Sequence, residues 1–160
     1  MDGRPVTDPD LQFRKARAAD LPAILALLAD DRLGAAREAS PADGLAPYLA
    51  ALAQIDADPN QFLCVIEQAG RVAGTLQLTF IPGLSRGGAL RGQIEAVRVA
   101  RDLRGAGIGR AAFDWAIAEC RARGCALVQL TTDRSRADAH RFYEGLGFQA
   151  SHIGYKLLLD

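Results

Sequence analysis

The sequence has 160 residues, and its 19 Lys and Arg balance its 19 Asp and Glu to a formal net charge of +0 at pH 7. This length suits a single domain, and the balanced charge gives no reason to expect a nucleic-acid partner. No apolar run reaches the roughly eighteen residues of a membrane span, and the first residues lack a signal-peptide pattern, so we expect a cytoplasmic protein without a membrane partner.

The N-terminal half predicts one strand and two helices after a loose leader over residues 1–9. Apolar and basic residues alternate from Leu11 to Arg17, as in a strand. Asp20 can cap the helix that follows, with Pro22 in its first turn. A second helix is expected over residues 46–57, and its apolar side would carry Leu45, Leu49, Leu52 and Ala53.

The middle of the chain predicts three strands joined as antiparallel hairpins. Two apolar runs, residues 62–67 and 72–81, are separated by a short turn at 68–71. A glycine-rich turn at 82–88 leads into the third strand, residues 90–99, and is expected to hang over the functional site.

Glycines punctuate the turn that follows this third strand. Gly105, Gly107 and Gly109 stand at alternate positions before an alanine-rich helix. Such spacing lets backbone N–H groups approach a bound group, and the positive end of the helix dipole favours a phosphate. The alternative is that one glycine only makes a tight turn. No Lys-Ser or Lys-Thr pair follows, and the G-x-G-x-x-G spacing is absent, so neither a P-loop nor a dinucleotide fold is indicated.

The C-terminal part predicts a helix over residues 107–123, a strand over 126–131, a short helix over 136–146 capped by Gly147, and a final hairpin of 148–153 and 155–159. In the first of these helices, Ile108, Ala112, Trp115 and Ala116 should face the sheet. The strand, helix and strand from residue 90 to 131 form a right-handed β-α-β crossover.

Three cysteines and two histidines are the soft metal ligands of the chain: Cys64, Cys120, Cys125, His140 and His152. Their spacing matches neither a metal motif nor a disulfide framework. We therefore expect no metal, and we expect thiols that behave as small apolar side chains.

Two motifs resemble those of the GNAT N-acetyltransferase superfamily. The stretch Arg104-Gly-Ala-Gly-Ile-Gly-Arg110 resembles the pyrophosphate-binding motif Arg/Gln-x-x-Gly-x-Gly/Ala, and Ala139-His-Arg-Phe-Tyr-Glu-Gly-Leu-Gly-Phe148 resembles the other signature. The likeness is close over residues 93–148. It implies an α/β (α+β) fold: a mixed, mostly antiparallel sheet of about six to seven strands, with a central parallel β-α-β pair and helices on both faces.

The resemblance also implies a function. It indicates an enzyme that transfers an acetyl group from acetyl-CoA to a primary amine of a small molecule or peptide, by direct attack in a ternary complex. The alternative is a non-catalytic acyl-CoA-binding or regulatory module, and a homodimer stays open. The implied cofactor-binding residues are Val97, Arg98, Val99, Arg104, Gly105, Ala106, Gly107, Ile108, Gly109 and Arg110.

Glu95 and Tyr143 are the candidate catalytic residues. Alternation along the strand places Glu95 on one face with Val97 and Val99, and burial among valines would make it a stronger base for an ammonium substrate. Its alternative is a structural carboxylate paired with Arg91 or Arg98. The family resemblance implies that Tyr143 is the general acid beside the thioester sulfur, and the alternative is a tyrosine that only packs.

Two further positions qualify these expectations. His140 is interpreted as an exposed helix residue, and Arg136 stands where the family often has asparagine, so that a cofactor contact is missing or replaced. The residues that would select the acceptor are expected in the loops at 30–38 and 82–88.

Overall fold

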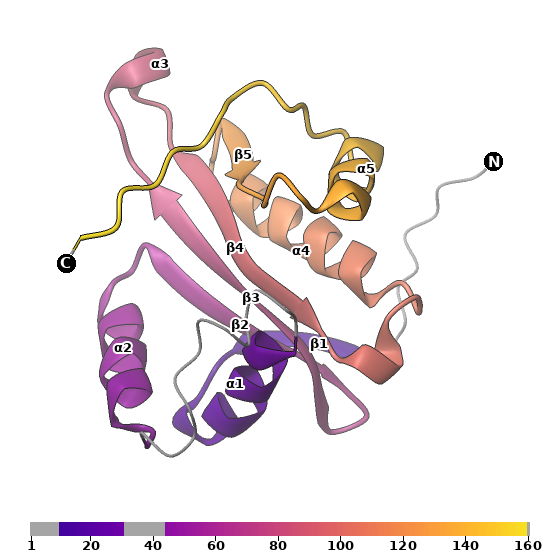
Figure 1. Ribbon diagram of the computed structural model, residues 1–160. Helices are drawn as coiled ribbons and strands as arrows, with labels where there is room; N and C mark the ends of the chain where they lie inside the picture. The colour runs from indigo at the N-terminus through magenta and orange to yellow at the C-terminus, as the bar shows by residue number, and fades with distance from the viewer. Residues whose placement is uncertain (1–9, 31–43, 160) are drawn as a thin grey trace. The chain divides into compact units, whose positions relative to one another are not determined.

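The computed structural model describes residues 10–30 and 44–159. These described residues fall into two compact units that meet in the sequence between residues 128 and 129. A five-stranded sheet has the order β1-β2-β3-β4-β5 (Figure 1). Its strands are β1 (Leu11–Lys15), β2 (Gln61–Gln68), β3 (Arg71–Ile81), β4 (Arg91–Val99) and β5 (Leu127–Leu130). The helices are α1 (Leu21–Ala29), α2 (Ala46–Ala57), α3 (Ser85–Gly88), α4 (Ile108–Ala122) and α5 (Ala137–Gly145), with short 3-10 turns η1 (Ala18–Asp20) and η3 (Arg101–Leu103).

Strands β2, β3 and β4 form the predicted antiparallel hairpins, and β1 pairs antiparallel with β2. In the β2–β3 turn, Ala69 has φ 49° and Gly70 has φ 76°. Two successive left-handed residues match the right-handed twist of the flanking strands, which is why a two-residue turn suffices here.

Strands β4 and β5 begin side by side. The N–H of Ala126 donates to the carbonyl of Leu90 at 2.8 Å, one residue before each strand starts. The two strands therefore run in the same direction, and the predicted strand–helix–strand unit around α4 with its parallel pair is confirmed.

The expected number of six to seven strands is wrong, because the final hairpin is not formed. In the described part of the chain, residues 148–159 contain no strand, and Tyr155 is 89% exposed. An alternating pattern makes a strand only where a neighbouring backbone completes its hydrogen bonds, and no strand of the described residues pairs with this segment.

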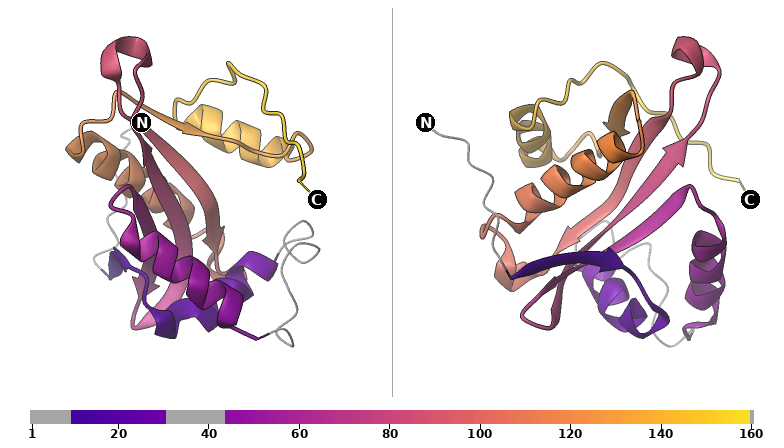
Figure 2. Two further views of the ribbon diagram at one scale, coloured as in Figure 1. Left: turned by 90° about the vertical axis from the view of Figure 1, so that its left-hand side faces the viewer. Right: turned by 180° about the vertical axis from the view of Figure 1, so that it is seen from behind.

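Within the first unit, helices cover both faces of the sheet, as expected. Figure 2 shows α4 on one face, with α1 and α2 on the other. On the α4 face, Ile108, Ala112 and Ala116 are buried, and Trp115 stacks on Phe13 with ring centroids 5.2 Å apart. The predicted apolar side of α4 is confirmed.

The packing of α4 on β4 depends on a glycine. A Cβ atom added at Gly92 would lie 2.4 Å from the Sγ atom of Cys120. Because Cys120 is fully buried, its pKa is raised to about 12, and the nearby Cys125 adds to this effect. Burial likewise raises the pKa of Cys64 to about 12. Cys64 and Cys120 are therefore buried as expected, and they remain uncharged thiols near neutral pH.

The other face is closed by α1 and α2. Helix α2 has the predicted bounds but not the predicted orientation, since Leu49 is 44% exposed while Leu52 is 5% exposed. Tyr48 and Ile55 pack beside Leu52 against the core. This helix has apolar residues all round, so packing with α1 and the sheet decides which side is buried.

Asp20 anchors α1 to the sheet rather than capping it. Its carboxylate accepts two bonds from Arg14, at 2.8 and 2.9 Å, and one from the N–H of Arg17 at 2.7 Å. No side-chain cap bond to α1 is formed, so the capping expectation is wrong. The bonds from Arg14 hold the pKa of Asp20 below its ordinary value.

We predict that Asp20→Asn destabilises the fold in a pH-dependent way. A lowered folded-state pKa means that the stabilisation is fully present above the ordinary carboxyl value of 3.8 and is lost as the pH falls through the lowered value. The substitution should lower the free energy of unfolding by about 1.5–3 kcal/mol at neutral pH, the usual range for hydrogen bonds to charged groups. The difference should shrink below about pH 4 in urea denaturation curves.

Asp56→Asn is the matched control. Asp56 pairs with Lys15 at 2.9 Å, but the two side chains are 42% and 47% exposed. This pair should contribute less than about 1 kcal/mol at any pH. Equal losses for Asp20→Asn and Asp56→Asn would refute the anchoring role of Asp20.

Candidate active site

The glycine turn after β4 adopts a backbone that favours glycine. Gly105 has φ 85° and Gly107 has φ 84°, whereas Gly109 lies inside α4. A Cβ atom at Gly105 or Gly107 would meet no atom within 4 Å, so the space in front of the turn is open. Two of the three predicted glycines therefore form the turn.

The start of α4 offers backbone donors beside this turn. Gly107 is its N-cap, no side chain caps it, and the first intrahelical bond runs from the N–H of Ala111 to the carbonyl of Gly107 at 3.0 Å. The N–H groups of Ile108, Gly109 and Arg110 precede that bond and have no acceptor within the helix. Together with the helix dipole, this arrangement suits a phosphate or pyrophosphate group.

Two arginines tie the turn to the end of α1. Arg101 and Arg104 donate to the Asp30 carboxylate at 2.6 and 2.8 Å, and Arg104 Nε donates to the carbonyl of Val99 at 3.1 Å. The hydrogen bond from Arg101, followed by the charges of both arginines, holds the pKa of Asp30 below its ordinary value. Arg104 thus fastens the turn to both β4 and α1.

A β-bulge interrupts β4 next to the candidate base. Thr75 pairs with Arg98 and Gln77 with Glu95, so that two residues of β4, Ala96 and Val97, oppose one residue of β3. Ala96 has φ 52°, a conformation that costs a non-glycine residue about 1–2 kcal/mol. Strain of this kind persists where the surrounding structure imposes it, and it is frequent at functional sites.

The bulge corrects the predicted surroundings of Glu95. Beyond it the alternation is inverted: Arg98, opposite Thr75, lies on the face of Glu95, while Val99 lies on the other face. Glu95 is exposed and opposite Gln77, so the expected burial among valines is wrong. Within residues 10–30 and 44–159, Glu95 forms no ion pair with Arg91 or Arg98, which removes the structural alternative in the form expected.

An apolar pocket of about 120 Å³ lies beside the bulge. It is lined by residues of α1 and α2, and Thr75, Gln77 and Ala96 of the sheet also line it. Sequence reasoning missed this pocket, because its lining residues come from five segments with no shared motif.

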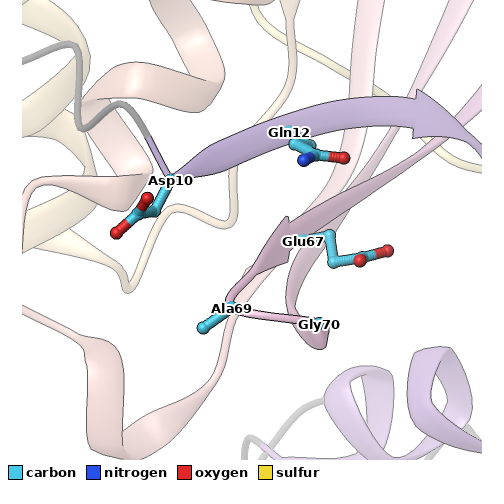
Figure 3. Close-up of a pocket in the computed structure, with 5 residues that line it drawn as sticks. All are labelled: Asp10, Gln12, Glu67, Ala69 and Gly70. Atoms are coloured by element: carbon cyan, nitrogen blue, oxygen red, sulfur yellow. The ribbon is translucent and has the colours of Figure 1, made fainter.

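A second cavity, of about 230 Å³, lies at the β2–β3 turn (Figure 3). Asp10 and Glu67 line it, and Glu67 already accepts a bond from Arg14 at 2.8 Å. Two carboxylates repel a phosphate, so this cavity does not suit the ligand that the turn favours.

The candidate acid, Tyr143, lies in the second unit. It is half-buried in α5, and its ring makes edge contacts with Phe142 and Phe148 at 5.7 and 6.3 Å between centroids. Its carbonyl accepts the N–H of Phe148 at 3.1 Å, and Gly147 has φ 92°. This helix end is a Schellman motif, which confirms the predicted left-handed cap.

The other predicted positions have supporting roles or lie elsewhere. His140 shares a hydrogen bond of 3.0 Å with the carbonyl of Asp133, and Arg136 is the N-cap residue of α5. The loop at 82–88 contains α3 and joins the end of β4 opposite to the glycine turn (Figure 1). Of the other loop expected to select the acceptor, residues 31–38 lie outside the described residues, as does the leader over residues 1–9.

These elements define an α/β protein. Its open glycine turn at the start of α4 suits a phosphate-bearing ligand, and the pocket beside the bulged strand suits a second small molecule. The family follows from comparison with known sequences. The model of the acetyltransferase (GNAT) family matches residues 22–148, and this chain belongs to that family.

Three known proteins are similar to this chain. Aminoalkylphosphonate N-acetyltransferase of Salmonella typhimurium is 34% identical over 61% of this chain and 63% of its own length, so the chain matches less than two thirds of that relative. Glucosamine 6-phosphate N-acetyltransferase of Trypanosoma brucei brucei is 34% identical over 88% of this chain and 90% of its own. A crystal structure described as a transcriptional regulator from Bacillus halodurans C-125 is 43% identical, with a TM-score of 0.89 over 93% of this chain and 99% of its own.

The described residues contain neither a candidate membrane span nor a candidate metal site. None of their helices is both long and apolar enough to cross a membrane, and no group of three or more histidine, cysteine or acidic side chains among them could hold a metal ion.

We predict that Gly107→Ala weakens the binding of acetyl-CoA by at least about tenfold. The new methyl group would occupy the open space in front of the turn, where the backbone must approach a phosphate. Titration calorimetry measures the affinity, and thermal unfolding measures the cost of the left-handed backbone.

Gly124→Ala is the matched control. Gly124 has φ 77° and equally open surroundings, but it lies past the other end of α4. Both variants should lose about 1–2 kcal/mol of stability, and only Gly107→Ala should lose affinity. Unchanged affinity in folded Gly107→Ala would show that the turn does not bind the coenzyme.

Proposed function

We propose that this protein transfers an acetyl group from acetyl-CoA to a primary amine of a small molecule or peptide, by direct attack within a ternary complex. The observation that carries the proposal is that one strand, β4, leads from the bulge at Ala96 through the short 3-10 turn η3 to the open glycine turn. A ligand phosphate at the turn and an acceptor at the bulge would then both lie along a single rigid strand.

The turn and β4 would hold the coenzyme. In the proposal the N–H groups of residues 105–110 bind its pyrophosphate, and the backbone of Val97, Arg98 and Val99 binds its pantetheine arm. Arg104 acts by fixing the turn through Asp30 and Val99. Acetyl-CoA supplies a thioester that is already reactive, so the protein contributes chiefly by positioning the two substrates.

Two residues would move protons. Glu95, exposed beside Gln77, is placed to take a proton from the acceptor ammonium directly or through water. Tyr143 is assigned as the acid that protonates the departing thiolate, an assignment that rests on its position in the family motif. The edge contacts of its ring with Phe142 and Phe148 would limit the orientations that the ring can take.

A second candidate is a regulatory module that binds acyl-CoA without turnover. It is favoured by the Bacillus halodurans structure, which is described as a transcriptional regulator. Incubation with acetyl-CoA and a panel of amines, including an aminoalkylphosphonate and glucosamine 6-phosphate, separates the two candidates. Release of free coenzyme A thiol that requires an amine supports the enzyme, whereas tight acetyl-CoA binding with no thiol release supports the module.

For Glu95→Gln we expect kcat/KM to fall by about 10²-fold or more at neutral pH and progressively less as the pH rises, because free amine then forms without a base. The melting temperature should stay within about 1 °C of wild type, since Glu95 is exposed. The pH–rate profile and the melting curve are measured on one sample. Glu119→Gln, on the α4 side of the sheet, is the control, and a wild-type profile for Glu95→Gln would exclude Glu95 as the base.

For Tyr143→Phe we expect kcat to fall by about 10²- to 10⁴-fold with little change in acetyl-CoA affinity. Phenylalanine keeps the ring contacts with Phe142 and Phe148 but lacks the hydroxyl proton. Tyr155→Phe changes an 89% exposed tyrosine and should leave turnover unchanged. If single-turnover rates of Tyr143→Phe match wild type, another group is the acid.

A further inference from the structure

The pocket beside the bulge is open to solvent and apolar in its walls. Leu25 and Leu28 of α1 and Tyr48 and Ile55 of α2 are half-buried around it, and Ala51 is exposed at its rim. Half-buried apolar side chains that surround an unfilled volume gain contacts when an apolar group enters.

Among residues 10–30 and 44–159, no charged side chain lines this pocket. Of its polar lining residues, Thr75 is 1% exposed and donates its hydroxyl to the carbonyl of Cys64 at 2.8 Å. Because its hydroxyl donor is already used in this bond, Thr75 behaves as an apolar wall residue of the pocket. On the sheet side of the pocket, the side-chain amide of Gln77 is then the polar group that can bind a ligand.

The Gln77 amide has a defined orientation. Its Nε2 donates to Gln61 Oε1 at 2.9 Å, and Thr79 Oγ1 donates to the same oxygen at 2.9 Å. The carbonyl oxygen of Gln77 is consequently turned away from Gln61 and can accept a bond from an ammonium group. Glu95 pairs with Gln77 across the ladder, so a carboxylate lies on the same face.

These features divide the acceptor region into two ends. At the sheet, Gln77, Glu95 and the bulge residue Ala96 offer acceptors to a positively charged amine. Between α1 and α2, the described lining residues are aliphatic side chains and Tyr48, so that most of the contact they offer is apolar. A molecule that satisfies both ends has an ammonium group next to a short apolar body.

We propose that the acceptor is a primary amine whose body is compact, uncharged and apolar, with about four or five carbons seated between α1 and α2. This inference rests on the proposed acetyltransferase function. Its size follows from the volume: an apolar protein cavity of roughly 150 Å³ holds benzene, and this pocket measures about 120 Å³.

This acceptor class differs from the substrates after which two relatives are named, an aminoalkylphosphonate and glucosamine 6-phosphate. A phosphate or phosphonate dianion in the pocket would lose its hydration, and none of the lining residues that the structure describes is a cation that could replace it. The pocket should therefore select against such amines as well as for apolar ones.

The test compares three amines with acetyl-CoA: 3-methylbutylamine, methylamine and O-phosphoethanolamine. Thiol release gives kcat/KM, and titration calorimetry gives binding to the protein. We expect kcat/KM for 3-methylbutylamine to exceed that for methylamine by about 10²-fold or more, since each buried methylene contributes roughly tenfold or somewhat less. O-phosphoethanolamine should not exceed methylamine.

Two alanines of α2 give a matched pair of variants. Ala51 lines the pocket, whereas Ala53 is exposed on the same helix and does not line it. Ala51→Phe should fill the pocket and bring 3-methylbutylamine down to the level of methylamine. Ala53→Phe should leave both the wild-type preference and the methylamine rate unchanged.

The outcomes separate this inference from the proposed function. Transfer to methylamine or O-phosphoethanolamine with no advantage for 3-methylbutylamine would overturn the inference and leave the acetyltransferase. Binding of 3-methylbutylamine that Ala51→Phe abolishes and Ala53→Phe keeps, without transfer to any amine, would support the pocket and overturn the enzyme. Absence of both binding and transfer would overturn both.

Discussion

Helix α4 approaches β4 so closely at Gly92 that a methyl group there would stand 2.4 Å from Cys120 Sγ. The far end of the same helix carries the open N–H groups, and the same strand carries the bulge at Ala96. The close approach at Gly92 therefore helps to position α4 on β4, and with it the glycine turn relative to the bulge. A side chain at this point would alter the site without touching it.

The bulge at Ala96 divides β4 into two segments that differ in burial and in the direction of their side chains. Before it, Gly92 and Ile94 are buried, and they fix the strand in the core. After it, the inverted alternation places Val99 on the opposite face from Glu95. The left-handed backbone of Ala96 is maintained because ladder pairs hold the strand on both sides of the bulge, at Gln77–Glu95 and Thr75–Arg98.

Local patterns were sufficient to predict most elements, and contacts between distant residues account for the failures. The hairpin strands, the glycine turn and the apolar side of α4 follow from periodicity and turn chemistry, and the structure confirms them. Nothing in the sequence around Ala96 indicates a bulge, because alanine suits a regular strand too. Asp20 resembles a helix cap by position, yet Arg14 of β1 engages its carboxylate. The final hairpin has the alternation of a strand, but among the described residues no strand pairs with it.

Asp30 connects the two halves of the site. It is the C-cap of α1, the helix that lines the apolar pocket. Its carboxylate forms ion pairs with Arg101 and Arg104, which directly precede the glycine turn. Movement of α1 on filling the pocket would be transmitted to the turn through these two ion pairs, and the converse holds for movement of the turn. Thermodynamic linkage requires such an effect to be reciprocal: whatever factor one ligand applies to the affinity of the other, it receives in return. The strength of any coupling between the glycine turn and the pocket would then depend on this carboxylate.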